Sequence, residues 1–417
     1  MFPMGMGFTN TGTGRRYSRV GGHTCAVTKP TWPPFPHVGG AGERAHVAKL
    51  AAIQADHNAA CEQNGNHELL RNSGTVAVAK DMEQVDRYSY GTILGATFAA
   101  IRPDLVNRMV LDGVSDSESY FNDIKQWGRD GMKDTQKVVS GFMSTCIEAG
   151  PTRCALALTQ DNKTETVQGP TDRLNALYTR MGNEPLVVGD TSSGTGIIQA
   201  HNVQSLVLGQ IYPPISWPFL AQTLASLEQG DGSLLHTVLF SEVYYQSTPT
   251  PYNQNLFNRS MQMSSTMEST NPILCGDSSL SNMTIEEYAD YFRELGKLNP
   301  VAEQWAQLVG SCCGWSFQAK ERYIGPWTVE KGLKKTKFPI LFVSLDADPV
   351  TPLPSAVKMS RAFGNESASL LVQQGPNRRL TSSTPRTAHP SLCTVKHIHD
   401  YFVEGKVPAN GTNCTPE

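Results

Sequence analysis

The chain has 417 residues and a formal net charge of −3 at pH 7. A chain of this length can bury a large core and form one large domain or two of average size. Because the charge shows no basic surplus, the sequence argues against a nucleic-acid partner. No segment approaches the roughly 20 consecutive apolar residues of a membrane-spanning helix, so no membrane partner is predicted either.

The N-terminal part of the chain carries weak structural signals. Residues 1–43 are rich in Gly, Thr and Pro and follow no sustained hydrophobic period, which predicts a poorly ordered segment. The stretch Met1–Val20 lacks an apolar core, so no signal peptide is predicted. Helices are expected over Glu43–Asp56 and Val76–Val85.

The stretch that begins at Ser89 indicates chemistry. Ser89 stands two residues before Gly91, and Gly91, Gly95 and Ala99 recur every four residues, which gives a helix one smooth face. An apolar strand is expected at Met109–Val114. A serine on a tight strand-to-helix turn is the nucleophile elbow of a serine hydrolase, so Ser89 is the predicted nucleophile. Such a serine needs a histidine to accept its proton.

Two features weaken this elbow. Arg87 stands where the Gly-x-Ser-x-Gly signature has its first glycine, and a side chain there crowds the turn. Only Asp86–Tyr88 separate the expected helix from Ser89, whereas a buried strand needs about five residues. The strand that carries the elbow is therefore expected to be missing, unless Thr75–Ala79 forms it.

The segment from residue 115 to about residue 320 has a different texture. It lacks the rhythm of strands and turns, and Ser247–Thr270 and Pro213-Pro214 are expected to be loops. Its long mixed runs predict the helices of a lid over the active site. These runs are Asp123–Ala149, Asp172–Met181, Trp217–Leu227 and Thr284–Leu295.

A second group of strands follows the predicted lid. Phe338–Leu345 is an apolar run of buried-strand type, and Asp348 comes shortly after it, where a triad carboxylate sits in a serine hydrolase. Asp346 is the alternative acid. A further strand is predicted at Ser369–Gln373, but the first histidine after it is His389. His389 is therefore the candidate base if its loop folds back, and otherwise a solvated surface residue.

The C-terminal segment Leu392–Phe402 is predicted to be an amphipathic helix with Val395, Ile398 and Phe402 facing inward. His397 and His399 then lie on its other face.

The cysteines and glycosylation sequons favour the secretory pathway. Plausible disulfides join Cys146 to Cys154, Cys275 to Cys312 or Cys313, and Cys393 to Cys414, with Cys25 and Cys61 left over. No cysteine spacing predicts a zinc site, and no cofactor is predicted. Asn-x-Ser/Thr sequons occur at Asn162, Asn258, Asn282, Asn365, Asn410 and Asn413.

Several motifs together resemble a known family. They are Ser89–Ala100 with Arg102–Val114, Ile273–Asp277, Cys313–Trp315, Gly325–Trp327, Asp348–Pro352, and the tail from Ser391 to Cys414. Over residues 45–417 the chain resembles the secreted, fungal-type tripeptidyl aminopeptidases of the prolyl-aminopeptidase-like α/β-hydrolases, including their TAP-like C-terminal domain.

The resemblance implies a role for each matched position. Ser89 would be the nucleophile, Asp348 the acid, and the Tyr90 amide an oxyanion donor. The family's histidine aligns with Arg378, and its Gly-Gly-Pro-Gly oxyanion loop has no counterpart in residues 1–44. These gaps suggest a truncated, mis-spliced or decayed copy of an aminopeptidase-like hydrolase.

The sequence therefore predicts an α/β-hydrolase fold with a mostly helical lid and without its N-terminal strands. The predicted divisions are 1–43, a core part 44–114, a lid 115–320 and a second core part 321–417. The predicted function is removal of residues from peptide N-termini. The alternatives are an inactive binding or vestigial protein and an esterase. The carboxylate that would hold a peptide's free amine is not identified, and Asp277 is expected to be structural.

Overall fold

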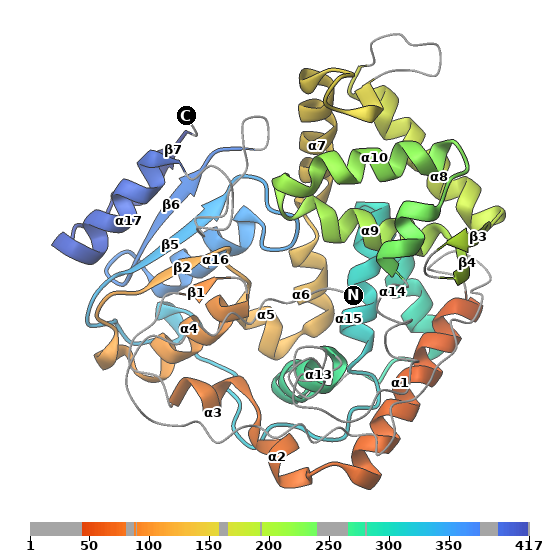
Figure 1. Cartoon of the computed structure of the whole chain (residues 1–417). Coiled ribbons are helices and arrows are strands. Elements are labelled where there is room, and N and C mark those ends of the chain that lie inside the picture. Colours follow the sequence, from red (N-terminus) through yellow and green to blue (C-terminus); the bar gives the residue numbers. More distant parts are fainter. Residues whose placement is uncertain are drawn as a thin grey trace, which may run out of the picture.

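The computed structural model describes residues 44–80, 87–88, 90–157, 166–191, 194–239, 266–279, 282–375 and 391–415. The predicted N-terminal segment 1–43 lies outside these ranges. In the described chain a parallel sheet occupies one side and a group of helices the other (Figure 1). The predicted α/β class and the helical insertion are thus confirmed.

The larger sheet has five strands in the order β1-β2-β5-β6-β7, and every neighbouring pair is parallel. Three of the strands were predicted, whereas the short C-terminal strand β7 was not. The strands are β1 (Arg87–Tyr88), β2 (Val110–Asp112), β5 (Ile340–Leu345), β6 (Ala368–Gln373) and β7 (Thr412–Cys414).

Strand β1 corrects the expectation that the strand before Ser89 is missing. It is two residues long, and Arg87 pairs with Leu111 while Tyr88 pairs with Asp112. The alternative strand at Thr75–Ala79 is wrong, because these residues belong to a helix. Residues 44–80 form only the helices α1 (Arg44–Asn64), α2 (His67–Asn72) and α3 (Thr75–Lys80).

Helices cover both faces of the sheet. Because side chains alternate along a strand, each strand contributes to both faces. On one face the sheet packs against α17 (Leu392–Glu404). On the other face it packs against α4 (Tyr90–Ile101) and α16 (Leu353–Phe363). The strand residues on the α17 side are Val110, Leu341, Val343 and Leu371.

The inward face of α17 differs from the prediction. Val395 is 41% exposed, while Tyr401 is fully buried and Ile398 and Phe402 are partly buried. The Tyr401 hydroxyl accepts a hydrogen bond from the Met109 amide at 2.8 Å. This polar anchor at the start of β2 sets the rotation of the helix.

The lid comprises the elements from α5 to α15, which lie between β2 and β5 in the sequence. The predicted helical runs are confirmed, and Asp123–Ala149 divides into two helices. The helices are α5 (Ser117–Asn122), α6 (Ile124–Gly131), α7 (Thr135–Ala149), α8 (Gln168–Asn183), α9 (Ala200–Ile211), α10 (Trp217–Glu228), α13 (Thr266–Asp277), α14 (Ile285–Leu298) and α15 (Glu303–Gly310).

Two parts of the lid differ from the prediction. An antiparallel hairpin joins β3 (Leu186–Thr191) to β4 (Gly194–Ile198), where no strands were expected. The end of the expected loop 247–270 belongs to α13, and residues 247–265 lie outside the described ranges. Among the described helices, none combines the length and the apolarity needed to cross a bilayer.

Short 3₁₀ helices connect the longer elements. They are η1 (Pro103–Leu105), η2 (Ala155–Ala157), η3 (Pro214–Ser216), η4 (Pro300–Ala302) and η5 (Val329–Lys331).

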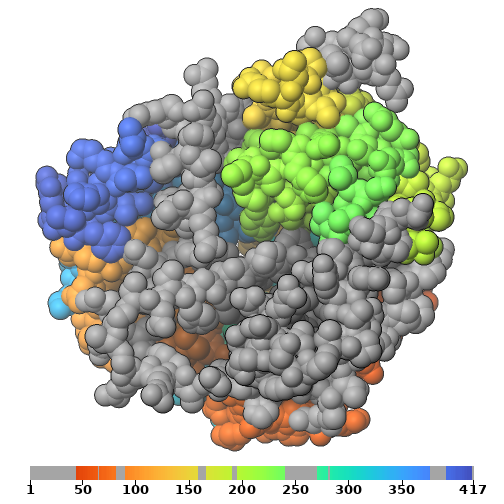
Figure 2. All heavy atoms as spheres, in the orientation of Figure 1, coloured from red at the N-terminus to blue at the C-terminus, as the bar shows by residue number. Residues whose placement is uncertain are grey.

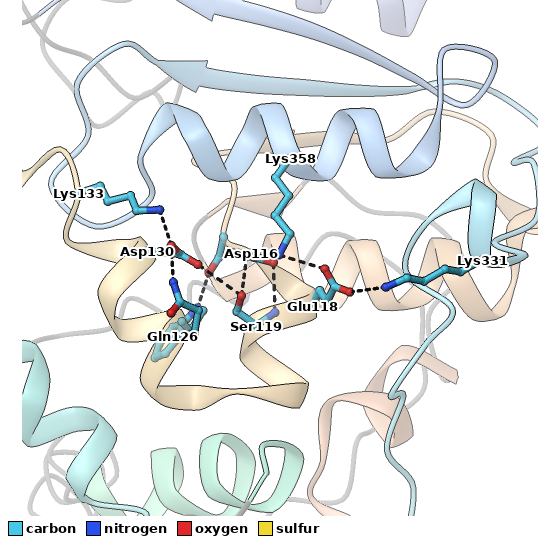
Figure 3. A network of polar contacts seen from close by, with 10 residues as sticks. Asp116, Glu118, Ser119, Gln126, Asp130, Lys133, Lys331 and Lys358 are labelled. Carbon is cyan, nitrogen blue, oxygen red and sulfur yellow. Dashed lines mark hydrogen bonds and ion pairs between the residues drawn. The ribbon is translucent and has the colours of Figure 1, made fainter. Parts of the chain in front are cut away.

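A polar cluster joins the core to the first lid helices (Figure 3). Lys358 of α16 extends its Nζ to 2.7 Å from Asp116 Oδ2 and 3.0 Å from Glu118 Oε2. Asp116 is only 2% exposed and also caps α5 by accepting the Ser119 amide at 3.2 Å. Lys331 of η5 approaches Glu118 from the other side, at 3.4 Å. The cluster therefore joins the start of the lid, at α5, to α16 and η5 of the core.

Disulfides tie separate parts of the described chain. The bonds Cys146–Cys154, Cys275–Cys312 and Cys393–Cys414 agree with the predicted pairs. Cys313 is a free thiol, and burial raises its pKa. Cys61 was expected to be left over, but it is disulfide-bonded.

The described sequon asparagines are all exposed, as glycan acceptors must be. They are Asn282, Asn365, Asn410 and Asn413, whereas Asn162 and Asn258 lie outside the described ranges.

In a space-filling view the C-terminal segment (blue) and the lid residues (yellow and green) occupy opposite sides of the upper half of the molecule (Figure 2).

Candidate functional site

The carboxyl ends of the parallel strands meet at one edge of the sheet, where open α/β sheets bind their ligands. Tyr90 follows β1, Ser115 follows β2 and Asp348 follows β5. Three segments that are far apart in the sequence therefore bring candidate site residues to one edge.

The strand-to-helix junction predicted around Ser89 is present. Strand β1 ends at Tyr88 and α4 begins at Tyr90, while Ser89 lies outside the described residues. Tyr90 is the first residue of α4, and its amide is the oxyanion donor that the sequence predicts. All residues from Thr92 to Ala99 are buried, and α4 contacts α3, β1 and β2. The core thus sets the position of Tyr90.

Asp348 is held in place by its own loop and by the lid. Its Oδ1 accepts hydrogen bonds from the amides of Val350 at 3.0 Å and Thr351 at 2.7 Å. Burial raises the pKa of the Asp348 carboxyl, and the two amide hydrogen bonds oppose that rise. Thr135, the first residue of α7, donates its hydroxyl to the Pro349 carbonyl at 2.8 Å. A carboxylate fixed in this way can orient a catalytic base.

The other sequence candidates differ in what the structure gives them. Asp346 accepts the Gly375 amide at 2.7 Å, so it holds the loop that leaves β6. Burial raises the pKa of the Asp346 carboxyl, and the hydrogen bond from the Gly375 amide lowers it. His389 and Arg378 lie outside the described residues.

A cavity of about 40 Å³ lies at this edge, between the core and the lid. Tyr90 and Val350 both line it, so the residue after the predicted nucleophile and the loop after the predicted acid share one cavity. None of its lining residues is charged, and its surface is mainly aromatic and aliphatic. The lining residues are Tyr90, Ile93, Ser115, Tyr120, Trp127, Thr270, Ile273, Leu274, Trp305, Val350 and Thr351.

Two residues of the cavity wall, Ser115 and Trp127, are hydrogen-bonded to each other. Trp127 donates its indole Nε1–H to Ser115 Oγ at 2.8 Å, and the Ser115 amide donates to Thr92 Oγ1 at 3.0 Å. The wall is therefore held rigid by a lid residue, a loop residue and a residue of α4.

Behind the cavity lies a buried carboxylate that the sequence did not mark as functional. Asp277 is fully buried and accepts hydrogen bonds from the hydroxyls of Thr75 at 2.5 Å and Tyr120 at 3.1 Å. Burial raises the pKa of Asp277 to about 6, although these hydrogen bonds and the charge of Arg322 act to lower it. The Thr75 hydroxyl also lies 2.5 Å from the Tyr90 hydroxyl.

No sequence signal connects Asp277 to Thr75 and Tyr90, because 202 residues separate Asp277 from Thr75. The one available clue was the proximity of Asp277 to Cys275, and it indicated only a structural role.

In the described part of the chain, Cys393, His397 and Cys414 place potential metal-ligand atoms within 4.8 Å of one another. The two cysteines are bonded to each other as a disulfide, so no thiolate is present to bind a metal ion.

Comparisons with known proteins agree with the fold. Residues 298–414 match the family model described as TAP-like protein. The matched residues include β5, β6, α17 and β7. The chain is 24% identical over 359 residues to the protein named "Putative hydrolase YuaR" from Escherichia coli (strain K12). That alignment covers 81% of this chain and 63% of the relative, so the chain spans less than two thirds of that protein's length. The parallel sheet and the helical insertion give this chain an α/β fold, and its C-terminal part is similar to the TAP-like family.

Proposed function

We propose that this protein is a serine hydrolase that removes residues from the N-termini of peptides, with Ser89 as its nucleophile. The observation that carries the proposal is the shared cavity at the sheet edge. Tyr90, which directly follows Ser89, and Val350, which follows Asp348, line the same cavity. The residue after the proposed nucleophile and the loop after the proposed acid therefore border one cavity, which supports a shared site.

The proposed reaction follows serine-hydrolase chemistry. The Ser89 hydroxyl attacks the substrate carbonyl carbon while His389 takes its proton, and Asp348 orients the imidazole. The Tyr90 amide stabilises the oxyanion of the tetrahedral intermediate. Collapse of that intermediate breaks the bond to the leaving amine, which receives the proton from His389. Water then hydrolyses the acyl-enzyme and restores the free serine.

The cavity favours an apolar group in the acyl part of the substrate. Its walls include the aromatic rings of Tyr120, Trp127 and Trp305, and no carboxylate lines it. A peptide with a free N-terminus also needs a carboxylate for its ammonium group. The cavity alone does not provide one, so an esterase with an apolar acyl group is the second candidate.

The secretory pathway is the proposed location. The disulfides Cys146–Cys154, Cys275–Cys312 and Cys393–Cys414 suit an oxidising compartment, and the four described sequon asparagines are exposed.

The deciding experiment is active-site labelling. The purified protein and Ser89→Ala would be treated with a fluorophosphonate, after circular dichroism and thermal melts have shown both to be folded. Labelling of the wild type that is lost in Ser89→Ala supports the serine hydrolase. Absence of labelling in folded wild type would contradict it and support a vestigial or binding protein.

A substrate comparison then separates the two enzymes. Aminoacyl and peptidyl anilides would be tested beside p-nitrophenyl esters of matched acyl groups. Cleavage of the anilides supports the peptidase, whereas turnover of esters alone supports the esterase. Labelling of His389→Ala at the wild-type rate would remove His389 from the proposed mechanism.

A further inference from the structure

A buried chain of hydrogen bonds connects the lid to the residue that follows the predicted nucleophile. Asp277 lies at the end of lid helix α13 and is fully buried. Its carboxylate accepts from Thr75, the first residue of α3, and the Thr75 hydroxyl meets the hydroxyl of Tyr90 at 2.5 Å. The chain thus runs from the lid through α3 to the first residue of α4.

The direction of these hydrogen bonds follows from the donors available. An ionised carboxylate can only accept, so the single hydroxyl proton of Thr75 is donated to Asp277. The Thr75 oxygen is then left as an acceptor, and the Tyr90 hydroxyl must be the donor to it. Tyr120, in the cavity wall, donates its own hydroxyl to the same Asp277 oxygen. One carboxylate therefore orders two tyrosines of the cavity.

Asp277 is itself firmly located. The Thr75 amide donates to its Oδ1 at 2.8 Å, and Arg322 donates its Nε–H to the Asp277 carbonyl at 2.5 Å. The disulfide Cys275–Cys312 ties the same turn of α13 to the end of α15. At Gly74 an added Cβ would lie 2.7 Å from Asp277 Oδ1, so only glycine permits this close approach.

We infer that Asp277 is a positioning residue, which acts through Thr75 to fix Tyr90 so that the Tyr90 amide faces the oxyanion. This inference rests on the proposed function. The proposed role of Asp277 differs from a purely structural one because the series of hydrogen bonds ends at Tyr90. Tyr90 lines the cavity, and its amide is the predicted oxyanion donor. This role also makes the lid a part of the site, since Asp277 belongs to the lid and Tyr90 to the core.

The test removes the central hydrogen bonds of the series that runs from Asp277 through Thr75 to Tyr90. Thr75→Val keeps the shape of the side chain and removes the hydroxyl, whereas Thr75→Ser keeps the hydroxyl. Tyr90→Phe removes the tyrosine hydroxyl that donates to Thr75. Thr97→Val is the matched control, because it deletes another buried threonine hydroxyl that bonds only within α4, to the Ile93 carbonyl. The readout is the rate of fluorophosphonate labelling, measured well below the melting temperature of every variant.

We expect Thr75→Val and Tyr90→Phe each to slow labelling by about 10- to 100-fold, since small displacements at a reacting centre cost this much. The double variant should be no slower than the slower single variant, because both changes break one link. Thr75→Ser and Thr97→Val should label within about threefold of wild type, a change worth about 0.65 kcal/mol.

Three results would overturn the inference. They are wild-type labelling rates in Thr75→Val, equal losses in Thr97→Val and Thr75→Val, or losses that multiply in the double variant. These outcomes differ from failure of the proposed function, in which folded wild type itself is not labelled by the fluorophosphonate.

Discussion

Thr75 donates both its amide and its hydroxyl to the carboxylate of Asp277, although 202 residues separate the two in the sequence. The first residue of α3 is thereby joined to the end of α13. Because the Asp277 carboxylate is fully buried, water and dissolved salt screen its electrostatic interactions only weakly. The ionisation of Asp277 must therefore be visible in the stability of the whole protein.

The first prediction concerns pH and Asp277. The folded-state pKa of about 6 lies above the usual value, so between about pH 4 and pH 6 the folded chain keeps a proton that the unfolded chain has lost. The contribution of Asp277 to the free energy of unfolding is therefore fully favourable below about pH 4. It falls by about 3 kcal/mol as the pH rises to 6, and then stays constant.

Asp277→Asn should remove this falling limb. Urea titrations of wild type and variant at half-unit steps from pH 4 to pH 7 would show it. Glu286→Gln is the control, since Arg44 lowers the pKa of that exposed carboxyl and its small effect has the opposite sign. Parallel pH profiles for wild type and Asp277→Asn would contradict the prediction.

The second prediction concerns Asp348. Asp348→Asn keeps an oxygen that can accept the amides of Val350 and Thr351, so the loop should remain folded and the melting temperature should change little. An amide cannot stabilise a positively charged imidazole, and the turnover number should fall by about 10³- to 10⁴-fold. Asp346→Asn, measured beside it, should lose much less. Equal losses in the two variants would remove the distinction between the two acids.

The third prediction concerns the junction of core and lid. Asp116→Asn removes the charge that Lys358 faces at 2.7 Å but keeps the cap of α5, because the amide oxygen can still accept from Ser119. Removing one partner of a buried ion pair costs about 3–5 kcal/mol, and the partial exposure of Lys358 places the expected loss at about 1–3 kcal/mol. Chemical denaturation would measure it. Lys335→Met, which breaks the exposed pair with Glu366, should change the free energy of unfolding by less than about 1 kcal/mol.

The fourth prediction concerns substrate size. Ile273 of α13 lines the cavity and is half-buried, so Ile273→Phe would fill part of the space without entering the core. Labelling by a fluorophosphonate with a bulky apolar group should slow relative to one with a small group, by about 10-fold or more. Ile285→Phe, another partly buried isoleucine in the lid but outside the cavity, should leave the ratio unchanged.

Local patterns predicted much of the fold. The apolar runs that became β2, β5 and β6 are short and bounded by turn residues, and the capping residues around Thr284 mark the start of α14. The hairpin of β3 and β4 was missed because Gly189, Gly194 and Gly196 dilute the strand signal. Hydrophobic periodicity also placed Val395 inside, whereas the hydrogen bond between Tyr401 and Met109 determines the orientation of α17.

The candidate site was predicted only in part. Asp348 and Tyr90 were proposed because each stands at a fixed place beside a strand or helix in a known sequence pattern, and the structure places Tyr90 and the loop after Asp348 at one cavity. The cluster around Asp277 was not, because it depends on the packing of segments that no spacing rule connects. A buried carboxylate beside a cysteine has many structural explanations, and only the hydrogen bonds to Thr75 and Tyr120 distinguish among them.

The pairing of β2 with β5 also bears on how the chain folds. These two central strands are neighbours in the sheet, yet the whole lid is synthesised between them. On the ribosome β2 can pair early with β1 but not with β5, which emerges only after the lid helices, and Val110 and Leu111 lack some of their final neighbours during that time. The lid is therefore expected to fold first, and the closing of the sheet over β2 is the step most exposed to aggregation.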